Sequence, residues 1–178
     1  AQWTATAAGC CLLQPQGEGV GLAAATFGRV QDYQVKDINN MGAAMAPAAA
    51  STLLHYFKDT GTEPQEFDCI YTGDLGQVGS QLLRELLAAE GLLIKNHVDC
   101  GCILIDANEQ SVKSGGSGPG CCAAVLCGHI LPRLRRGSQT RVLFTATGAL
   151  MSQTTFLQKE TIPAVAHLVE LRAPEKEK

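Results

Sequence analysis

The sequence predicts an α/β fold in which helices lie in layers against a mixed, mostly parallel, five-stranded sheet. Strand-like apolar runs alternate with segments of helical periodicity along most of the 178 residues, which is typical of layered α/β folds. Residues 67–72 form a short apolar run with turn residues on both sides, as in strands buried in a parallel sheet. The stretch that begins at Cys121 is apolar all round its first two helical turns, which predicts a helix buried on every side.

Two extended runs, residues 4–13 and 20–33, are the first predicted elements. Residues 14–19 between them contain proline and glycine and favour a turn. The two runs are therefore predicted to form a β-hairpin.

A helix is predicted over residues 41–58. Asn39 or Asn40 can cap its N-terminus, and Pro47 is expected to set its start or a kink. Gly61 is expected to end it.

After the strand at residues 67–72, apolar residues recur at helical spacing over residues 78–91, and Gly91 is expected just after the helix end. Residues 96–106 show no regular period and are expected to be irregular. A glycine-rich loop, residues 114–120, then opens directly into the predicted buried helix.

That helix is expected to run over residues 121–136, and its last turn carries three arginines that complement the helix dipole. Residues 142–147 and 164–171 are predicted strands. The charged residues 175–178 are expected to fray.

Charge and composition exclude several classes of protein. Charged residues make up 17% of the chain, against about 25% in an average soluble domain. A net charge of −3 gives no basic surface for nucleic acid. No apolar stretch is long enough to cross a bilayer, and the N-terminus has no basic signal-peptide region. The many small apolar residues suggest that another chain or another half covers part of the surface.

The eight cysteines are expected to be reduced, because the chain can build a core without disulfides. Zinc is the alternative, with Cys100, Cys102, Cys121 and Cys122 as its four ligands. Their spacing does not match the usual pattern of two to four intervening residues, so no metal site is predicted.

Five motifs, taken together and in order, carry a family likeness. They are residues 41–49, 71–76, 99–101, 115–118 and 146–152. The chain resembles the stage V sporulation protein AD family of spore-forming bacteria over nearly its whole length. That family looks like thiolases, whose fold consists of two similar halves with buried central helices.

The resemblance implies a division of the chain into three parts. Residues 1–19 would be the last strand of a missing N-terminal thiolase-like half and a turn. Residues 20–172 would be the C-terminal half of this duplicated fold, and residues 173–178 a charged tail.

The chemistry implied by the resemblance is mostly negative. Thiolases and ketoacyl synthases take their nucleophilic cysteine from the first half, which this chain does not contain. Ketoacyl synthases add a His from a His-Gln-Ala-Asn motif and an Asn from a Gly-Asn motif, which polarise a thioester carbonyl. Residues 73–76 and 115–117 stand at those places and lack both side chains. No catalytic residue, cofactor or enzyme activity is therefore expected.

Thiolases proper would place a His in the glycine loop and a second Cys near Thr147. Those places hold Gly116 or Ser117 and Ala146 or Thr147, which do not transfer protons as a His or an activated Cys does. The histidines of the chain are expected to have structural roles: His55, His97, His129 and His167.

The family is associated with dipicolinic acid (pyridine-2,6-dicarboxylate) and its uptake into the developing spore, which implies a ligand for this chain. A planar dianion needs backbone N–H groups, a helix N-terminus or a cation. The loop at residues 114–120 offers the first two and Lys113 a cation, although the loop is equally explained as a tight turn that starts the helix near a sheet. The predicted ligand-binding residues are Gly73, Asp74, Asp99, Cys100, Gly101, Gly116, Ser117 and Gly118.

Asp99 would repel a dianion unless it is protonated or the ligand arrives as its calcium chelate. Calcium is thus expected only as part of the ligand. The resemblance also implies other stage V sporulation proteins of the same transport system as partners, a homodimer, and a peripheral position on the cytoplasmic face of the spore inner membrane.

The alternative is an acyltransferase with a different active centre, in which Cys100 or Cys121 at a helix N-terminus has a lowered pKa. It lacks an assignable histidine base. A phosphate or dinucleotide site is excluded, because neither characteristic glycine motif occurs.

Overall fold

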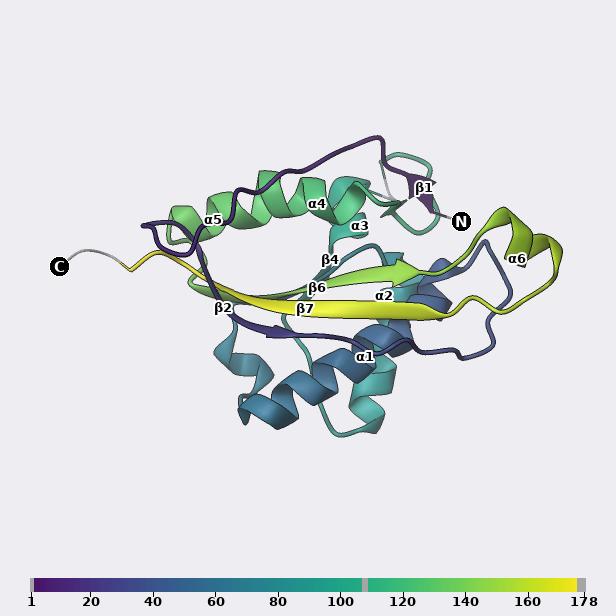
Figure 1. The fold of residues 1–178 in the computed structure, drawn as a ribbon, viewed down its shortest axis with the longest axis horizontal. Coiled ribbons are helices and arrows are strands. Elements are labelled where there is room, and N and C mark those ends of the chain that lie inside the picture. Colours follow the sequence, from purple (N-terminus) through teal and green to yellow (C-terminus); the bar gives the residue numbers. More distant parts are fainter. Residues whose placement is uncertain (1, 107–108, 176–178) are drawn as a thin grey trace.

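The computed structural model describes residues 2–106 and 109–175 and arranges them in layers around a central sheet (Figure 1). The strands are β1 (Trp3–Thr4), β2 (Gly21–Thr26), β3 (Cys69–Thr72), β4 (His97–Asp99), β5 (Gly116–Ser117), β6 (Arg141–Ala149) and β7 (Ala164–Arg172). The helices are α1 (Met41–Thr60), α2 (Gly76–Ala89), α3 (Cys100–Leu104), α4 (Cys121–Val125), α5 (Leu131–Arg135) and α6 (Gln153–Leu157), with a 3-10 turn η1 (Pro64–Glu66) and a π-helical turn η2 (Leu126–Ile130). Residues 176–178 of the predicted tail lie outside the described residues.

The central sheet confirms the predicted α/β class with a five-stranded sheet, although β4 replaces the predicted strand at residues 4–13. The strand order is β2-β7-β6-β3-β4. β6, β3 and β4 are parallel neighbours, while β7 is antiparallel to both β6 and β2. β7 therefore opposes the other four strands, because residues 150–163 turn back at the sheet end instead of crossing over its face.

The sheet separates two apolar cores that use alternate side chains of each strand. On β3, Ile70 packs in the core with α1 and α2, whereas Cys69 and Tyr71 belong to the core under α4, η2 and α5. α1 crosses α2 where Gly42 meets Gly79: a Cβ added at Gly42 would lie 2.4 Å from the Leu75 carbonyl oxygen. Part of the small-residue composition is thus needed for close packing inside this chain.

The predicted N-terminal hairpin is wrong. β1 pairs in parallel with β5 of the glycine-rich loop, and β2 pairs with β7. Residues 5–13 form no strand and run across the outer side of the α4–η2–α5 helix (Figure 1). Tertiary pairing overrides the local turn signal here, because each short strand finds a longer-range partner with unpaired backbone groups.

The predicted first helix and its boundaries are confirmed. Asn40 caps α1, its Oδ1 accepting from the Ala43 N–H at 3.3 Å. Gly61 ends the helix in the left-handed conformation, with φ 66°, and its N–H donates to the Phe57 carbonyl. Pro47 lies inside the helix, which continues past it to Thr60.

The predicted helix after the glycine loop is present, and the described residues bury one of its faces. The buried residues Cys121, Val125, Ile130 and Leu134 lie on one face. The five-residue step from Val125 to Ile130 passes through the π turn η2, which keeps both on that face. The opposite side is half-buried or exposed, because only one face of the helix packs on the sheet.

Residues 96–106 are more regular than predicted. β4 adds an edge strand parallel to β3, with Ile70 opposite His97 and Thr72 opposite Asp99. α3 follows immediately, and Asp99 caps it. A three-residue strand next to a five-residue helix is too short to show a period in the sequence.

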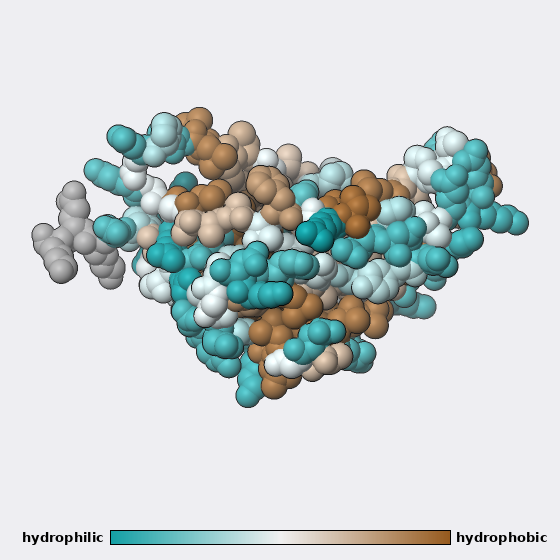
Figure 2. Space-filling model, turned by 60° about the horizontal axis from the view of Figure 1, so that its bottom comes forward, coloured by the Kyte–Doolittle hydropathy of each residue, from teal (hydrophilic) through white to brown (hydrophobic). Residues whose placement is uncertain are grey.

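The surface combines apolar patches with polar stretches, and Figure 2 shows both on one face. Exposed apolar side chains include Leu12, Leu13 and Phe27, each more than three-quarters exposed. No helix among the described residues is both long and apolar enough to span a membrane.

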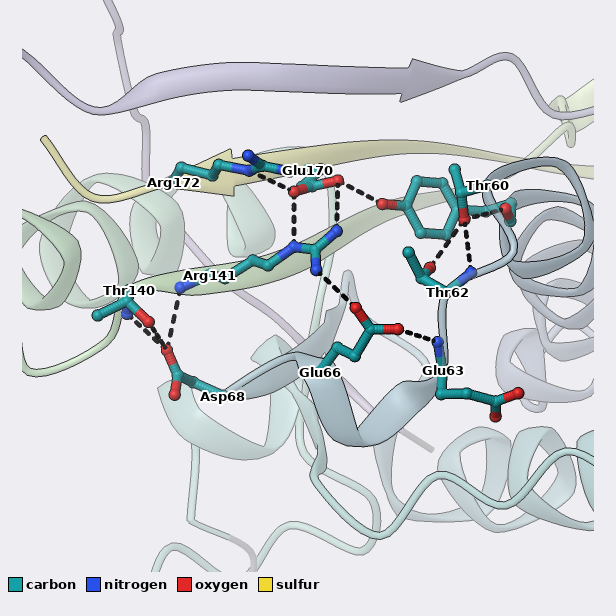
Figure 3. A network of polar contacts seen from close by, with 10 residues as sticks. Thr60, Thr62, Glu63, Glu66, Asp68, Thr140, Arg141, Glu170 and Arg172 are labelled. Atoms are coloured by element: carbon teal, nitrogen blue, oxygen red, sulfur yellow. Dashed lines mark hydrogen bonds and ion pairs between the residues drawn. The ribbon is translucent and has the colours of Figure 1, made fainter. Parts of the chain in front are cut away.

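An ion-pair network around the buried Glu170 closes the sheet at the end where β6 begins and β7 ends. Figure 3 shows Glu170 between Arg141 and Arg172. Its Oε1 accepts from both arginine Nε atoms at 2.8 and 2.7 Å, and its Oε2 accepts from the Tyr56 hydroxyl at 2.5 Å. Burial opposes the charge, but the hydrogen bonds from Arg141, Tyr56 and Arg172 lower the pKa of Glu170 to about 2.

We expect Glu170→Gln to lower the free energy of unfolding by about 2–4 kcal/mol at neutral pH, because an amide at this buried position cannot pair with Arg141 and Arg172 as a carboxylate does. The lowered pKa means that this contribution is present above pH about 4.5 and is lost as the pH falls towards about 2. Denaturant unfolding should therefore show a large gap between wild type and variant at pH 7 and a clearly smaller gap near pH ~3.

Glu18→Gln, in an exposed loop, is the matched control and should change stability at neither pH. An equal gap between wild type and Glu170→Gln at both pH values would contradict the expected linkage.

Candidate functional site

The predicted ligand-binding residues meet at the edge of the sheet where the parallel strands β3, β4 and β6 end. Thr72 at the end of β3 lies opposite Asp99 of β4 and Thr145 of β6. The glycine loop packs against this edge: a Cβ added at Gly101 would lie 2.3 Å from the Gly116 carbonyl oxygen. Gly101 and Gly116, both among the predicted ligand-binding residues, thus lie side by side.

Asp99 is the most connected residue of this edge and is almost fully buried. Its Oδ2 accepts from the Thr72 hydroxyl at 2.7 Å and the Leu75 N–H at 2.9 Å. Its Oδ1 accepts from the N–H groups of Gly76 at 2.9 Å and Gly101 at 3.0 Å. One carboxylate thus joins the turn after β3 to the turn after β4.

Burial raises the pKa of Asp99 to about 6, while the hydrogen bonds from Thr72, Gly76 and Leu75 limit the rise. The carboxyl is therefore mostly ionised at neutral pH. Of the two ways in which a dianion could be tolerated beside it, protonation of Asp99 at pH ~7 would cost about 1.4 kcal/mol of the binding free energy.

Asp74 holds the glycine loop in place. Its Oδ2 accepts from the Gly118 N–H at 2.9 Å, and its Oδ1 accepts from the Thr147 hydroxyl at 3.1 Å. Gln2 completes the attachment, its Nε2 donating to the carbonyl oxygens of Asp74 and Gly116 at 2.8 and 2.9 Å. Asp74 and Gln2 therefore position the loop, and the Gly118 N–H is already used.

His97 belongs to this network, which the sequence analysis did not find because β4 was not predicted. The Thr72 hydroxyl donates to Asp99, so it accepts from His97 Nε2–H at 2.9 Å. The other ring nitrogen faces Arg84 Nη1 at 3.5 Å. Burial, and then the Arg84 charge, lower the pKa of His97 to about 4. The imidazole is neutral at pH 7 and both of its nitrogens are occupied.

The cysteines near this edge are not activated. Burial, with the Asp99 charge next, raises the pKa of Cys100 far above its ordinary value. Burial, followed by the Asp74 charge, raises the pKa of Cys121 to about 12. The acyltransferase alternative needed the opposite direction at one of these two thiols. Within residues 2–106 and 109–175, no group of His, Cys, Asp or Glu side chains could hold a metal ion, so nothing supports the zinc alternative.

The remaining histidines have contacts outside the predicted site residues. His55 bonds to the Ser51 carbonyl at 2.7 Å, and His167 Nδ1 accepts from the Gly28 N–H at 3.1 Å. His129 packs edge-on against Tyr71. These contacts agree with the structural roles expected for them.

A groove of about 230 Å³ lies beside α6. Its lining includes the side chains of Lys36, Phe156 and Lys159. None of the predicted ligand-binding residues lines it, so a binding experiment has to distinguish this groove from the glycine loop.

Comparison with known proteins gave one family and several similar proteins. The family model of stage V sporulation protein AD matches residues 1–172. Stage V sporulation protein AD of Bacillus subtilis (strain 168) is 42% identical over 165 residues, which are 92% of this chain and 48% of that protein. The chain thus spans about half the length of this curated relative.

Solved structures of condensing enzymes are also similar in shape. The tetronic acid condensing enzyme AbyA1 has a TM-score of 0.46 at 17% identity, covering 89% of this chain and 43% of its own. The 3-oxoacyl-[acyl-carrier-protein] synthase III of Aquifex aeolicus VF5 has a TM-score of 0.43 at 11% identity, covering 89% and 46%.

We expect Asp99→Asn to lower the free energy of unfolding by about 2–4 kcal/mol, because an amide NH₂ would face N–H donors that now meet a carboxylate. Urea unfolding at neutral pH measures the loss. Asp59→Asn, an exposed residue of α1, is the matched control. A loss no larger than that of the control would show that the four hydrogen bonds are not formed in solution.

NMR titration should find His97 neutral down to pH about 4 in the folded protein and titrating near 6.5 after unfolding. Because the folded pKa is the lower one, this residue's contribution to stability is lost as the pH falls from about 6.5 to about 4. Arg84→Met should raise the pKa only partly, since burial remains. Arg136→Met, a change at an exposed arginine, should leave it unchanged; a folded pKa near 6.5 in wild type would refute the buried, neutral imidazole.

Proposed function

Because the chain belongs to the stage V sporulation protein AD family, we propose that it is part of a non-catalytic, thiolase-like scaffold that binds dipicolinic acid for uptake into the developing spore. The glycine loop beside the ends of β3 and β4 is the proposed binding surface. The observation that carries the proposal is that Asp74 and Asp99 hold the turns and the glycine loop in place by hydrogen bonds. These side chains are used to position the backbone and not to transfer protons.

The electrostatics of the edge favour the calcium chelate as the bound form. Asp74 and Asp99 place two carboxyl groups next to the loop, and Asp99 is mostly ionised at neutral pH. A free dianion would be repelled by them, whereas dipicolinate with one Ca²⁺ carries no net charge. The calcium is cargo in this proposal, and no resident metal is assigned.

Acyl transfer is the less supported candidate. It needs a nucleophile and a base in contact, whereas the thiols of Cys100 and Cys121 have raised pKa values. His97 lies nearby, but its ring nitrogens face Thr72 and Arg84 and not a thiol.

The wider assignment follows from the family and is part of the proposal. The protein would act as a homodimer at the cytoplasmic face of the spore inner membrane, held peripherally by other stage V sporulation proteins of the same transport system. No nucleic-acid partner is part of the proposal.

Calorimetric titration of dipicolinate, with and without calcium, into the full-length protein tests the proposal. Ser117 is the position to change, because it is half-exposed on the loop. Gly116 is buried, and a Cβ there would lie 3.4 Å from the Gly101 carbonyl oxygen and from Ile105, so its side chain would point into the protein and not towards a ligand. Ser117→Phe should weaken binding by about tenfold or more by blocking the loop, while Ser117→Ala should stay close to wild type.

Calcium should strengthen binding to the wild-type protein. Absence of heat under both conditions would refute dipicolinate binding altogether. A loss of binding in Lys159→Glu but not in Ser117→Phe would instead place the ligand in the groove beside α6.

A further inference from the structure

A threonine near the end of β6 is bonded to Asp74 at two places. The Thr147 hydroxyl donates to Asp74 Oδ1 at 3.1 Å and accepts from the Asp74 N–H at 3.2 Å. These bonds fix both the backbone and the carboxyl group of Asp74. Thr147 pairs with Ala166 of β7, and its branched side chain has few rotamers. The carboxyl group is therefore held from a rigid part of the sheet.

The glycine before Asp74 leaves room for this contact. A Cβ added at Gly73 would lie 2.5 Å from Thr147 Oγ1 and 2.9 Å from the Thr147 backbone nitrogen. A side chain at position 73 would therefore push the hydroxyl away from Asp74. Gly73 was predicted to bind the ligand, and its contact with Thr147 explains a glycine at this position without any ligand.

The second carboxyl oxygen of Asp74 fixes one peptide unit of the glycine loop. Asp74 Oδ2 accepts from the Gly118 N–H at 2.9 Å. The carbonyl oxygen of the same peptide unit, that of Ser117, accepts from the Ala5 N–H at 2.7 Å. A glycine has several backbone conformations of similar energy, and these two bonds select the one in which Gly118 has φ 105°.

We propose that Thr147 is a positioning residue for ligand binding: it orients the carboxyl group of Asp74, which in turn sets the orientation of Ser117 on the loop. This role rests on the proposed function, in which Ser117 lies on the binding surface. A carboxyl group that is bonded through one oxygen can rotate, whereas the bond from Thr147 to Oδ1 keeps Oδ2 directed at the Gly118 N–H. All of these contacts lie between groups of this chain and require no exposed face.

Thr145, two residues earlier in β6, offers a matched control. Its side chain lies on the same face of the strand and is fully buried. Among the described residues, however, its Oγ1 has no hydrogen-bond partner. A change from threonine to valine replaces the hydroxyl by a methyl group of similar shape. At Thr147 this change removes two hydrogen bonds to Asp74, whereas at Thr145 it removes none.

Calorimetric titration of calcium dipicolinate into the full-length protein tests the role in binding. Thr147→Val should weaken binding about tenfold, because Ser117 then has to be ordered when the ligand binds. Thr147→Ser keeps the hydroxyl and should bind within about twofold of wild type. Thr145→Val should bind like wild type. Unchanged affinity in Thr147→Val, or an equal loss in Thr145→Val, would overturn the proposal.

Amide hydrogen exchange of the ligand-free, full-length protein tests the positioning independently of any ligand. In Thr147→Val the Gly118 amide should exchange about tenfold faster, because the loop opens more easily. The amide of Leu53, a buried residue of α1, should keep its wild-type rate.

Three results would separate the alternatives. Equal acceleration at Gly118 and Leu53 would show a general loss of stability and overturn the proposal. Weaker binding with unchanged exchange at Gly118 would show that Thr147 contacts the ligand directly, and it would overturn the proposal as well. Faster exchange at Gly118, in a protein whose wild type binds no dipicolinate, would support the positioning of the loop by Thr147 and refute the proposed function.

Discussion

A carboxylate buried as deeply as Asp99 is stable only where enough donors reach it, and three of its four donors are backbone N–H groups. Their positions depend on the turns after β3 and β4, so the charge and the two turns require one another. Gly76 makes this possible, since its φ is 66° and a Cβ there would lie 2.3 Å from the Ser114 carbonyl oxygen. The glycine loop can approach only because the turns beneath it are arranged in this way.

The predictions that succeeded used information local to each element. Asn40 and Gly61 were predicted correctly as the two ends of α1, because a capping side chain and a left-handed residue each act within one helical turn. The alternation of elements gave the fold class, and the likeness of the motifs brought the site segments together. These signals do not depend on the rest of the chain.

The predictions that failed needed contacts between distant residues. Nothing in the sequence near Trp3 or near Gly116 predicts that these residues pair. The turn residues 14–19 therefore led to the wrong prediction of a local hairpin. β4 is defined by its pairing with β3, which the sequence of β4 alone does not reveal. The contacts of His97 and Asp99 with Thr72 depend on that pairing and were therefore missed. The all-round burial predicted for the helix after the loop stays a prediction, because it requires a cover from a second half and the described residues bury only one face.

The loop from Gly115 to Gly118 is held from several sides, and this decides how it can recognise a ligand. Asp74 takes the Gly118 N–H, β1 bonds to the carbonyls of Gly115 and Ser117, and Gly101 lies against Gly116. A loop with its backbone already engaged loses little entropy when it binds, but it has fewer free donors for an anion. A neutral, metal-chelated ligand suits such a surface better than a bare dianion. It needs a complementary shape and a few contacts, whereas a dianion needs donors or cations that neutralise its two negative charges. The N-terminal segment is one side of this arrangement, so whatever fixes residues 5–13 on the helix also fixes the proposed ligand-binding surface.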